Sequence, residues 1–129
     1  MAKIEKFEDM EIWQLARKIC VNVYHIIETT ELNGNYALRN QMDRSSGSIM
    51  DNIAEGFERS GNKEFRQFLS ISKGSCGELR SQFYRALDRG YIDKSTFNAQ
   101  IKILQLESKK ISSFMHYLKK SEYKGSKFD

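Results

Sequence analysis

The sequence of 129 residues contains no proline and only two cysteines and two histidines. Proline is the residue that most often ends or kinks a helix, so its absence favours long helices and argues against a loop-rich chain. Cys20 and Cys76 are too few for a disulfide framework or a zinc site, and we expect both in apolar surroundings. No apolar run approaches the roughly 20 residues that cross a bilayer, and no signal-peptide pattern opens the chain. We therefore expect a cytoplasmic protein without a membrane segment.

Charge is present in both signs but is unevenly distributed. The formal net charge is +4, and 40% of the residues are hydrophobic, as in an ordinary globular protein. Residues 101–129 hold seven lysines against three acidic residues, whereas residues 1–100 are balanced. The length predicts one domain over residues 1–129, with all of the excess positive charge in its last quarter.

Three turn signals divide the chain into segments in which apolar residues recur every three or four positions, which is the helical period. The segments predict helices at about 10–30, 36–59, 63–89 and 94–121, with residues 122–129 outside the last helix. Connections this short make successive helices antiparallel. The predicted fold class is therefore all-α, an antiparallel up-and-down four-helix bundle.

Two of these helices should begin at a capping side chain. Asp9 is placed to cap the first helix, and Asn62 is placed to cap the third. One face of the third helix carries only small residues: Ser70, Gly74, Gly77 and Ser81. Because glycine weakens a helix, we expect the backbone of a neighbouring helix to approach closely at this face.

The last helix carries more apolar residues than one stripe requires. Its core stripe is predicted to be Phe97, Ile101, Leu104, Ser108, Ile111, Met115 and Leu118. A second stripe, well over 100° around the helix, comprises Ile103, Leu106, Phe114 and Tyr117. A wide arc facing the core is one interpretation. The separation of the stripes favours a second packing partner, and another copy of the chain is the economical choice.

The second helix contains polar residues inside its apolar period. Arg44, Ser48, Asp51 and Glu55 rise on one face at steps of four, three and four. Together with Asn52, we expect Arg44 and Glu55 to form a partly buried hydrogen-bonded network that holds the register between helices. Such a carboxylate could instead serve as an acid or base. No second carboxylate or histidine is placed to complete a reaction.

The two histidines do not stand in a metal-binding pattern. A di-metal site in a helical bundle uses Glu-x-x-His pairs, but Asn22 and Ser113 stand three positions before His25 and His116. A serine–histidine–acid triad stays open by counting alone, but no residue near either histidine points to one. We expect no metal, no cofactor and no enzymatic activity.

The lysines of the last helix are the remaining candidates for binding. Lys102, Lys109 and Lys120 share one flank, and Lys110 and Lys119 extend the positive charge toward the C-terminus. One interpretation is a solvated face whose cations complement the helix dipole. The other is a surface that contacts the phosphates of a nucleic acid.

Several strings of this sequence resemble a known family. In the second segment they are Gln41, Arg44, Ser48-Ile49 and Asn52-Ile-Ala-Glu-Gly56, and in the third they are Phe68-Leu69, Gly74-Ser75, Glu78-Leu79, Gln82 and Gly90-Tyr91-Ile92. These strings resemble the signature of the four-helix-bundle family named for proteins encoded in 23S ribosomal RNA intervening sequences. The opening block, Met10–Gln14 with Ala16 and Tyr24, is similar to that of the family, so the resemblance covers roughly residues 7–120.

The sequence departs from the family pattern at three positions. Met50 stands where a proline is usual, Asp43 where an arginine is usual, and Ser45 where an alanine is usual. Without the proline we expect a straighter second helix. The aspartate removes one positive charge from a face that could touch nucleic acid.

The resemblance implies a bundle that assembles into a ring, typically a homopentamer, with a link to structured RNA and no enzymatic activity. A related branch resembles the accessory protein of diversity-generating retroelements. Together with the lysines, it leads us to expect a non-enzymatic homo-oligomer that binds RNA or DNA weakly and without sequence preference. The alternative is a scaffold that recruits a protein partner and does not contact nucleic acid.

Overall fold

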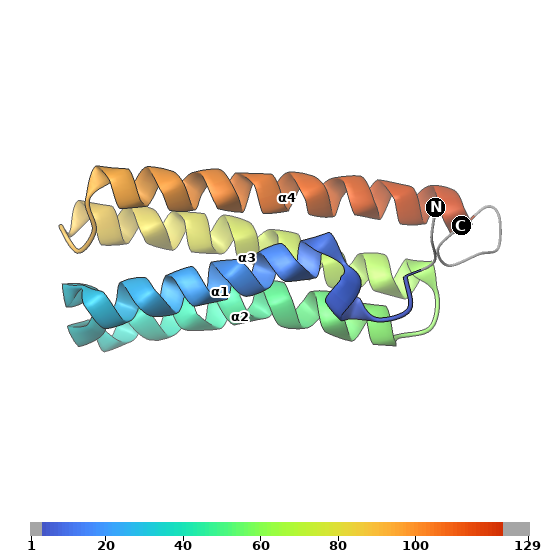
Figure 1. Ribbon diagram of the computed structural model, residues 1–129, viewed down its shortest axis with the longest axis horizontal. Coiled ribbons are helices and arrows are strands. Elements are labelled where there is room, and N and C mark those ends of the chain that lie inside the picture. The colour runs from blue at the N-terminus through green and yellow to red at the C-terminus, as the bar shows by residue number, and fades with distance from the viewer. Residues whose placement is uncertain (1–3, 123–129) are drawn as a thin grey trace.

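The computed structural model describes residues 4–122, which form four long helices with nearly aligned axes (Figure 1). The elements are η1 (Phe7–Asp9), α1 (Glu11–Thr29), η2 (Glu31–Gly34), α2 (Tyr36–Glu58), α3 (Asn62–Asp88) and α4 (Lys94–Glu122). Each helix packs against the one before it, and α1 also packs against α4, which closes the bundle. The predicted all-α antiparallel bundle is confirmed, with every helix boundary within one residue of its predicted position. The two 3₁₀ turns, η1 and η2, were not predicted.

The connections between helices are fixed by local hydrogen bonds. The side chain of Asn35 accepts the backbone N–H of Leu38 at 3.1 Å and so caps α2. At the end of α3, Gly90 adopts φ +75°, and the N–H of Tyr91 donates to the carbonyl of Ala86 at 3.0 Å. This glycine-dependent ending turns the chain sharply toward α4.

The two predicted caps are wrong. Met10, not Asp9, precedes α1, and it has no side chain that accepts a hydrogen bond. Gly61 precedes α3 with φ +86°, a conformation that glycine adopts without strain. Asn62 instead lies inside the bundle, where its Nδ2 donates to the carbonyl of Leu118 at 3.2 Å. Asn62 therefore ties the start of α3 to the end of α4.

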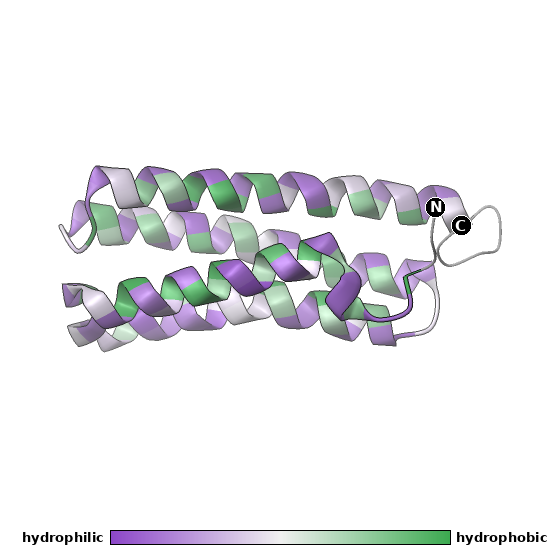
Figure 2. Ribbon diagram, viewed as in Figure 1, coloured by the Kyte–Doolittle hydropathy of each residue, from purple (hydrophilic) through white to green (hydrophobic). Residues whose placement is uncertain are grey.

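The core lies along the axis between the four helices, and apolar and polar residues alternate around each ribbon accordingly (Figure 2). Its largest fully buried side chains are Phe65, Phe83, Ile19, Leu32, Leu38, Met42, Ile49, Ile53, Leu69, Leu79, Leu104 and Ile111. On α4 the buried apolar residues fall at intervals of seven: Phe97, Leu104, Ile111 and Leu118. These four belong to the predicted core stripe, whereas its other three members are only half-buried.

The close approach between helices occurs at a different glycine from those predicted. A Cβ added to Gly56 would lie 2.8 Å from both Cδ1 of Phe65 and Cβ of Phe68, so α3 passes tightly over α2 there. At Gly74 and Gly77 a Cβ would meet no atom within 4 Å. The expectation that the small-residue face of α3 contacts a neighbouring helix of the same chain is therefore wrong.

The residues that the structure describes include no helix with the length and apolar character needed to cross a bilayer.

Candidate functional site

Three of the predicted lysines form a line on the outside of α4. Lys102, Lys109 and Lys120 are exposed and make no hydrogen bond or ion pair with another described residue. Because 3.6 residues make one helical turn, the three lie within about 20° of one line, spaced about 10 and 16 Å along the axis. The three ammonium groups can therefore point to the same side of the bundle.

The other predicted lysines differ from this line. Lys110 is half-buried and forms an ion pair with Glu11 of α1, so it does not extend free positive charge as expected. Its ammonium is neutralised because α1 packs against α4 at this point. Lys119 is exposed. Lys124 and Lys127 lie outside the described residues.

An apolar groove of about 610 Å³ separates the start of α1 from the C-terminal half of α4. It is lined by apolar residues, among them Met10, Leu106 and Phe114. Both signs of charge stand on its rim, with Lys109 and Lys110 from α4 and Asp9 and Glu11 from the N-terminal segment. We call this feature the α1–α4 groove.

The predicted oligomer stripe borders this groove but is not fully unpartnered. Leu106 is 46% exposed, whereas Ile103, Phe114 and Tyr117 are half-buried and pack against the core. The ring of Phe114 stacks on Tyr117 and meets Phe65 edge-on, with centroids 5.7 Å apart in each pair. The stripe thus combines a wide core-facing arc with one strongly exposed leucine.

A polar cleft of about 320 Å³ lies between α2 and α3. Its lining residues are Gln41, Arg44, Ser45, Ser48, Glu78 and Gln82. Two hydrogen bonds join the helices here: Ser45 Oγ donates to Glu78 Oε1 at 3.1 Å, and Ser75 Oγ donates to Ser48 Oγ at 2.8 Å. We call this feature the α2–α3 cleft, and it gathers most of the polar residues that carry the family resemblance.

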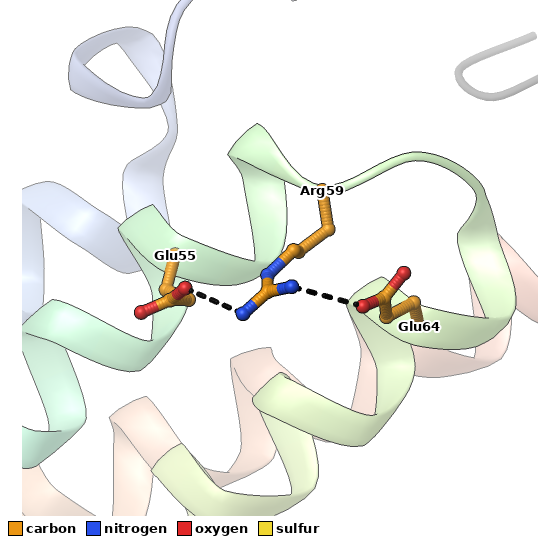
Figure 3. Close-up of polar contacts among 3 residues, drawn as sticks. All are labelled: Glu55, Arg59 and Glu64. Atoms are coloured by element: carbon orange, nitrogen blue, oxygen red, sulfur yellow. Dashed lines mark hydrogen bonds and ion pairs between the residues drawn. The ribbon is translucent and has the colours of Figure 1, made fainter.

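The expected buried network around Glu55 is not present. Glu55 is exposed and pairs with Arg59 at 2.9 Å, and Arg59 also pairs with Glu64 of α3 at 3.5 Å (Figure 3). Asn52 is half-buried, and its Nδ2 donates to the carbonyl of Ser48 at 2.8 Å within the same helix. Glu55 faces away from the core because the buried side of α2 at this level is formed by Ile53 and Gly56. Ion pairs in this setting contribute little to stability, so a structural role for Glu55 is weakened.

Arg44, the third member of that expected network, is exposed and does not bond to Glu55 or Asn52. It instead lines the α2–α3 cleft. The prediction therefore placed Arg44 and Asn52 on the correct helix but with the wrong partners.

Glu107 of α4 is a buried carboxyl group that sequence reasoning missed. It is 0% exposed, and neither of its carboxylate oxygens has a hydrogen-bond partner among the described residues. Burial raises the pKa of Glu107 from 4.5 to about 8; Lys110 opposes that rise and Glu11 adds to it. The sequence did contain an indication of this position. The buried apolar residues of α4 recur every seven positions, and this spacing places both position 107 and position 108 on the side of the helix that faces the core.

Cys76 of α3 lies in the same part of the core. It is fully buried, and burial together with the charge of Glu107 raises the pKa of its thiol to about 12. Cys20 is half-buried, and its Sγ donates to the carbonyl of Ser46 at 3.2 Å. The expected buried position is therefore confirmed for Cys76, whereas Cys20 is only half-buried and contacts a polar backbone group.

The histidines lie apart from all of these features. His25 and His116 are both exposed. Within residues 4–122 no three His, Cys, Asp or Glu side chains gather closely enough to hold a metal ion.

Comparison with known proteins identifies one family. A sequence model of the family described as 23S rRNA-intervening sequence protein matches residues 8–113, which include α1, α2, α3 and most of α4. A search of curated proteins finds no match.

Proposed function

Because the chain belongs to the 23S rRNA-intervening sequence protein family, we propose that it is a non-enzymatic, cytoplasmic bundle that assembles with copies of itself and binds RNA or DNA weakly. The family description names a segment of ribosomal RNA and names no reaction. The observation that carries the nucleic-acid part is the line of Lys102, Lys109 and Lys120, three exposed cations that no acidic side chain of the described chain neutralises.

The binding we propose is electrostatic. Each lysine that contacts a phosphate releases counterions, so the affinity falls as the salt concentration rises. Lysine is a flexible point charge and does not read base edges bidentately as arginine does. Binding through this line therefore has little sequence preference.

Self-association would strengthen this binding. Leu106 is exposed on the side of α4 where the apolar groove opens, and a second copy packed there would cover both. A ring of five copies, the favoured assembly, would carry a net charge of about +20 and repeat the lysine line around one axis. Light scattering at micromolar concentration should then give several times the 15.1 kDa mass of one chain.

A second candidate function is a scaffold that recruits a protein. The mixed charge on the rim of the α1–α4 groove supports it, because two signs of charge around an apolar floor suit a protein surface better than a phosphate backbone.

The experiment that separates the two is fluorescence anisotropy with labelled structured RNA and labelled duplex DNA at about 50 and about 200 mM salt. The test variant carries Lys102→Glu, Lys109→Glu and Lys120→Glu. The matched control carries Lys18→Glu, Lys63→Glu and Lys73→Glu, which change the net charge equally at three exposed positions outside α4.

We expect the wild type to bind at low salt. On duplex DNA, the logarithm of its affinity should fall by about 0.9 for each phosphate contacted when the salt concentration rises tenfold. The test variant should lose most of this binding, and the control should keep most of it. Equal loss in both variants would mean that only net charge matters. No binding by the wild type would leave the scaffold as the better proposal.

A further inference from the structure

The α2–α3 cleft holds two opposite charges that do not pair with each other. Arg44 and Glu78 both line it, yet Arg44 makes no hydrogen bond or ion pair with another described residue. Glu78 accepts one hydrogen bond, from Ser45 through Oε1, which leaves Oε2 without a hydrogen-bond donor among the described residues. An empty space between an unpaired guanidinium and a half-used carboxylate fits a ligand that presents acceptors and donors side by side.

A buried amide side chain borders the same cleft. Gln82 is only 6% exposed and lines the cleft, and its Oε1 has no hydrogen-bond partner among the described residues. Buried polar groups in proteins almost always have a partner, so an unpaired one calls for an explanation. A ligand in the cleft that donates a hydrogen bond to this amide would supply it.

The hydroxyl of Ser48 is also poised to donate. Its oxygen already accepts from Ser75 Oγ at 2.8 Å and from Asn52 Nδ2 at 3.0 Å. A hydroxyl oxygen accepts two hydrogen bonds, so its remaining capacity is its own hydrogen. Gln41 is in a similar state, because its Oε1 accepts from Arg85 at 2.6 Å and its Nε2 remains to donate. The cleft therefore offers donors on its α2 side and acceptors on its α3 side.

We propose that the α2–α3 cleft binds a guanine base. Guanine carries the acceptors O6 and N7 next to the donors N1–H and N2–H, and arginine is the usual partner of the first pair. Arg44 would take O6 and N7, while Glu78 and Gln82 would accept N1–H and N2–H. Adenine, cytosine and uracil do not present two adjacent donors to a carboxylate. The volume of about 320 Å³ is enough for one base.

This site is separate from the lysine line of α4. The inference rests on the proposed function in one respect, because a bound nucleic acid would supply the guanine base. Phosphate contacts on α4 would hold a strand without reading it, whereas the cleft would read one unpaired base. Sequence-specific recognition of RNA generally uses unpaired bases whose hydrogen-bonding edges are free.

Uncharged nucleosides test the cleft independently of the lysines. Saturation-transfer NMR and equilibrium dialysis would measure guanosine, inosine, adenosine, cytidine and uridine against the wild type. We expect guanosine to bind best and the other nucleosides at least about fivefold more weakly, including inosine, which lacks the N2 amino group. The free amino acid glycine is measured alongside the nucleosides, because a zwitterion could also bridge an arginine and a carboxylate.

Three variants test the named contacts. Glu78→Gln keeps an oxygen that can accept from Ser45 but removes the carboxylate, and Arg44→Gln removes the guanidinium from an exposed position. Gln82→Leu replaces the buried amide by an apolar side chain of similar size. Each should lose guanosine binding at an unchanged or higher melting temperature. Glu58→Gln and Arg89→Gln, exposed and outside the cleft, are the matched controls.

The outcomes separate this inference from the proposed function. Guanosine binding that the cleft variants abolish and the triple lysine variant leaves intact would support the cleft, whatever the RNA measurements give. Equal binding of all nucleosides, preferential binding of glycine, no binding of guanosine by the wild type, or binding unaffected in Glu78→Gln and Arg44→Gln would each overturn it. Loss of RNA binding in the triple lysine variant tests the lysine line alone.

Discussion

Replacing the buried carboxyl of Glu107 by an amide should stabilise the protein, and the gain should grow with pH. Glu107 is fully buried in α4, with Lys110 on its own helix, Glu11 of α1 and Cys76 of α3 as the ionisable groups that act on it or respond to it. Glu107→Gln keeps the size of the side chain and its polar end. It removes only the ability to ionise, so the effect reports directly on the buried charge.

The magnitude follows from the raised pKa. Between its ordinary value of 4.5 and about 8, the folded protein holds a proton on Glu107 that the unfolded chain has lost. Below about pH 4.5, the ionisation of Glu107 therefore costs no stability. As the pH rises from there toward 8, the free energy of unfolding falls by up to about 1.4 kcal/mol per pH unit. At about pH 7 the loss amounts to about 3 kcal/mol, which Glu107→Gln should recover. This corresponds to about 10 °C in melting temperature for a domain of this size.

Urea unfolding of the wild type and Glu107→Gln between about pH 5 and pH 8 measures the effect. The two free energies of unfolding should differ by less than about 1 kcal/mol at the acidic end and diverge steadily toward the basic end. Glu58→Gln, at an exposed position of α2, is the control and should follow the wild type throughout. Parallel profiles for the wild type and Glu107→Gln, or a variant that is less stable at pH 8, would show that the carboxylate is ionised and stabilised in the folded protein.

Three further predictions concern the glycines and the thiols. Gly56→Ala should lower the free energy of unfolding by about 1–2 kcal/mol, because the buried ring of Phe65 cannot move away from the new methyl group; unchanged stability in urea would contradict it. Gly74→Ala should instead raise it by about 0.5–1 kcal/mol, because the methyl group meets open space, and a loss of stability or of assembled mass by light scattering would mean that another chain packs there. Cys76 should stay unreactive toward a thiol reagent until the protein unfolds, since it is buried with a pKa of about 12; absorbance that reports two fast thiols in the native protein would refute this.

The sequence was sufficient for the helices because a chain without proline shows its helical period with little interruption. The rotation of α4 could not be predicted to the same accuracy. Positions 107 and 108 are neighbours on the helix, and hydropathy favours Ser108 over Glu107 for a core site. The packing of α4 against α1 and α3 buries Glu107 instead, which only the three-dimensional arrangement decides.

The candidate sites were predicted less completely, for two physical reasons. A glycine-rich face indicates where a close approach is sterically allowed but not whether a neighbour is present, so the close approach was expected at Gly74 and Gly77 and was missed at Gly56. The α2–α3 cleft depends on residues from two helices whose relative register no single period reveals. Arg44 and Ser48 stood out in the sequence as polar residues within a helical period, and most of the other members only as family resemblance, so their joint arrangement could not be predicted.

The contact at Gly56 has a consequence for how members of this family can diverge. The distance of 2.8 Å to Phe65 and Phe68 leaves no room for a side chain at position 56 unless an aromatic residue opposite becomes smaller. Alanine or serine at position 56 should therefore be accompanied, among homologues, by a smaller residue at position 65 or a shifted backbone at position 68. Residues 56, 65 and 68 should therefore covary among homologues, whereas Gly74 and Gly77 should vary independently of these three positions.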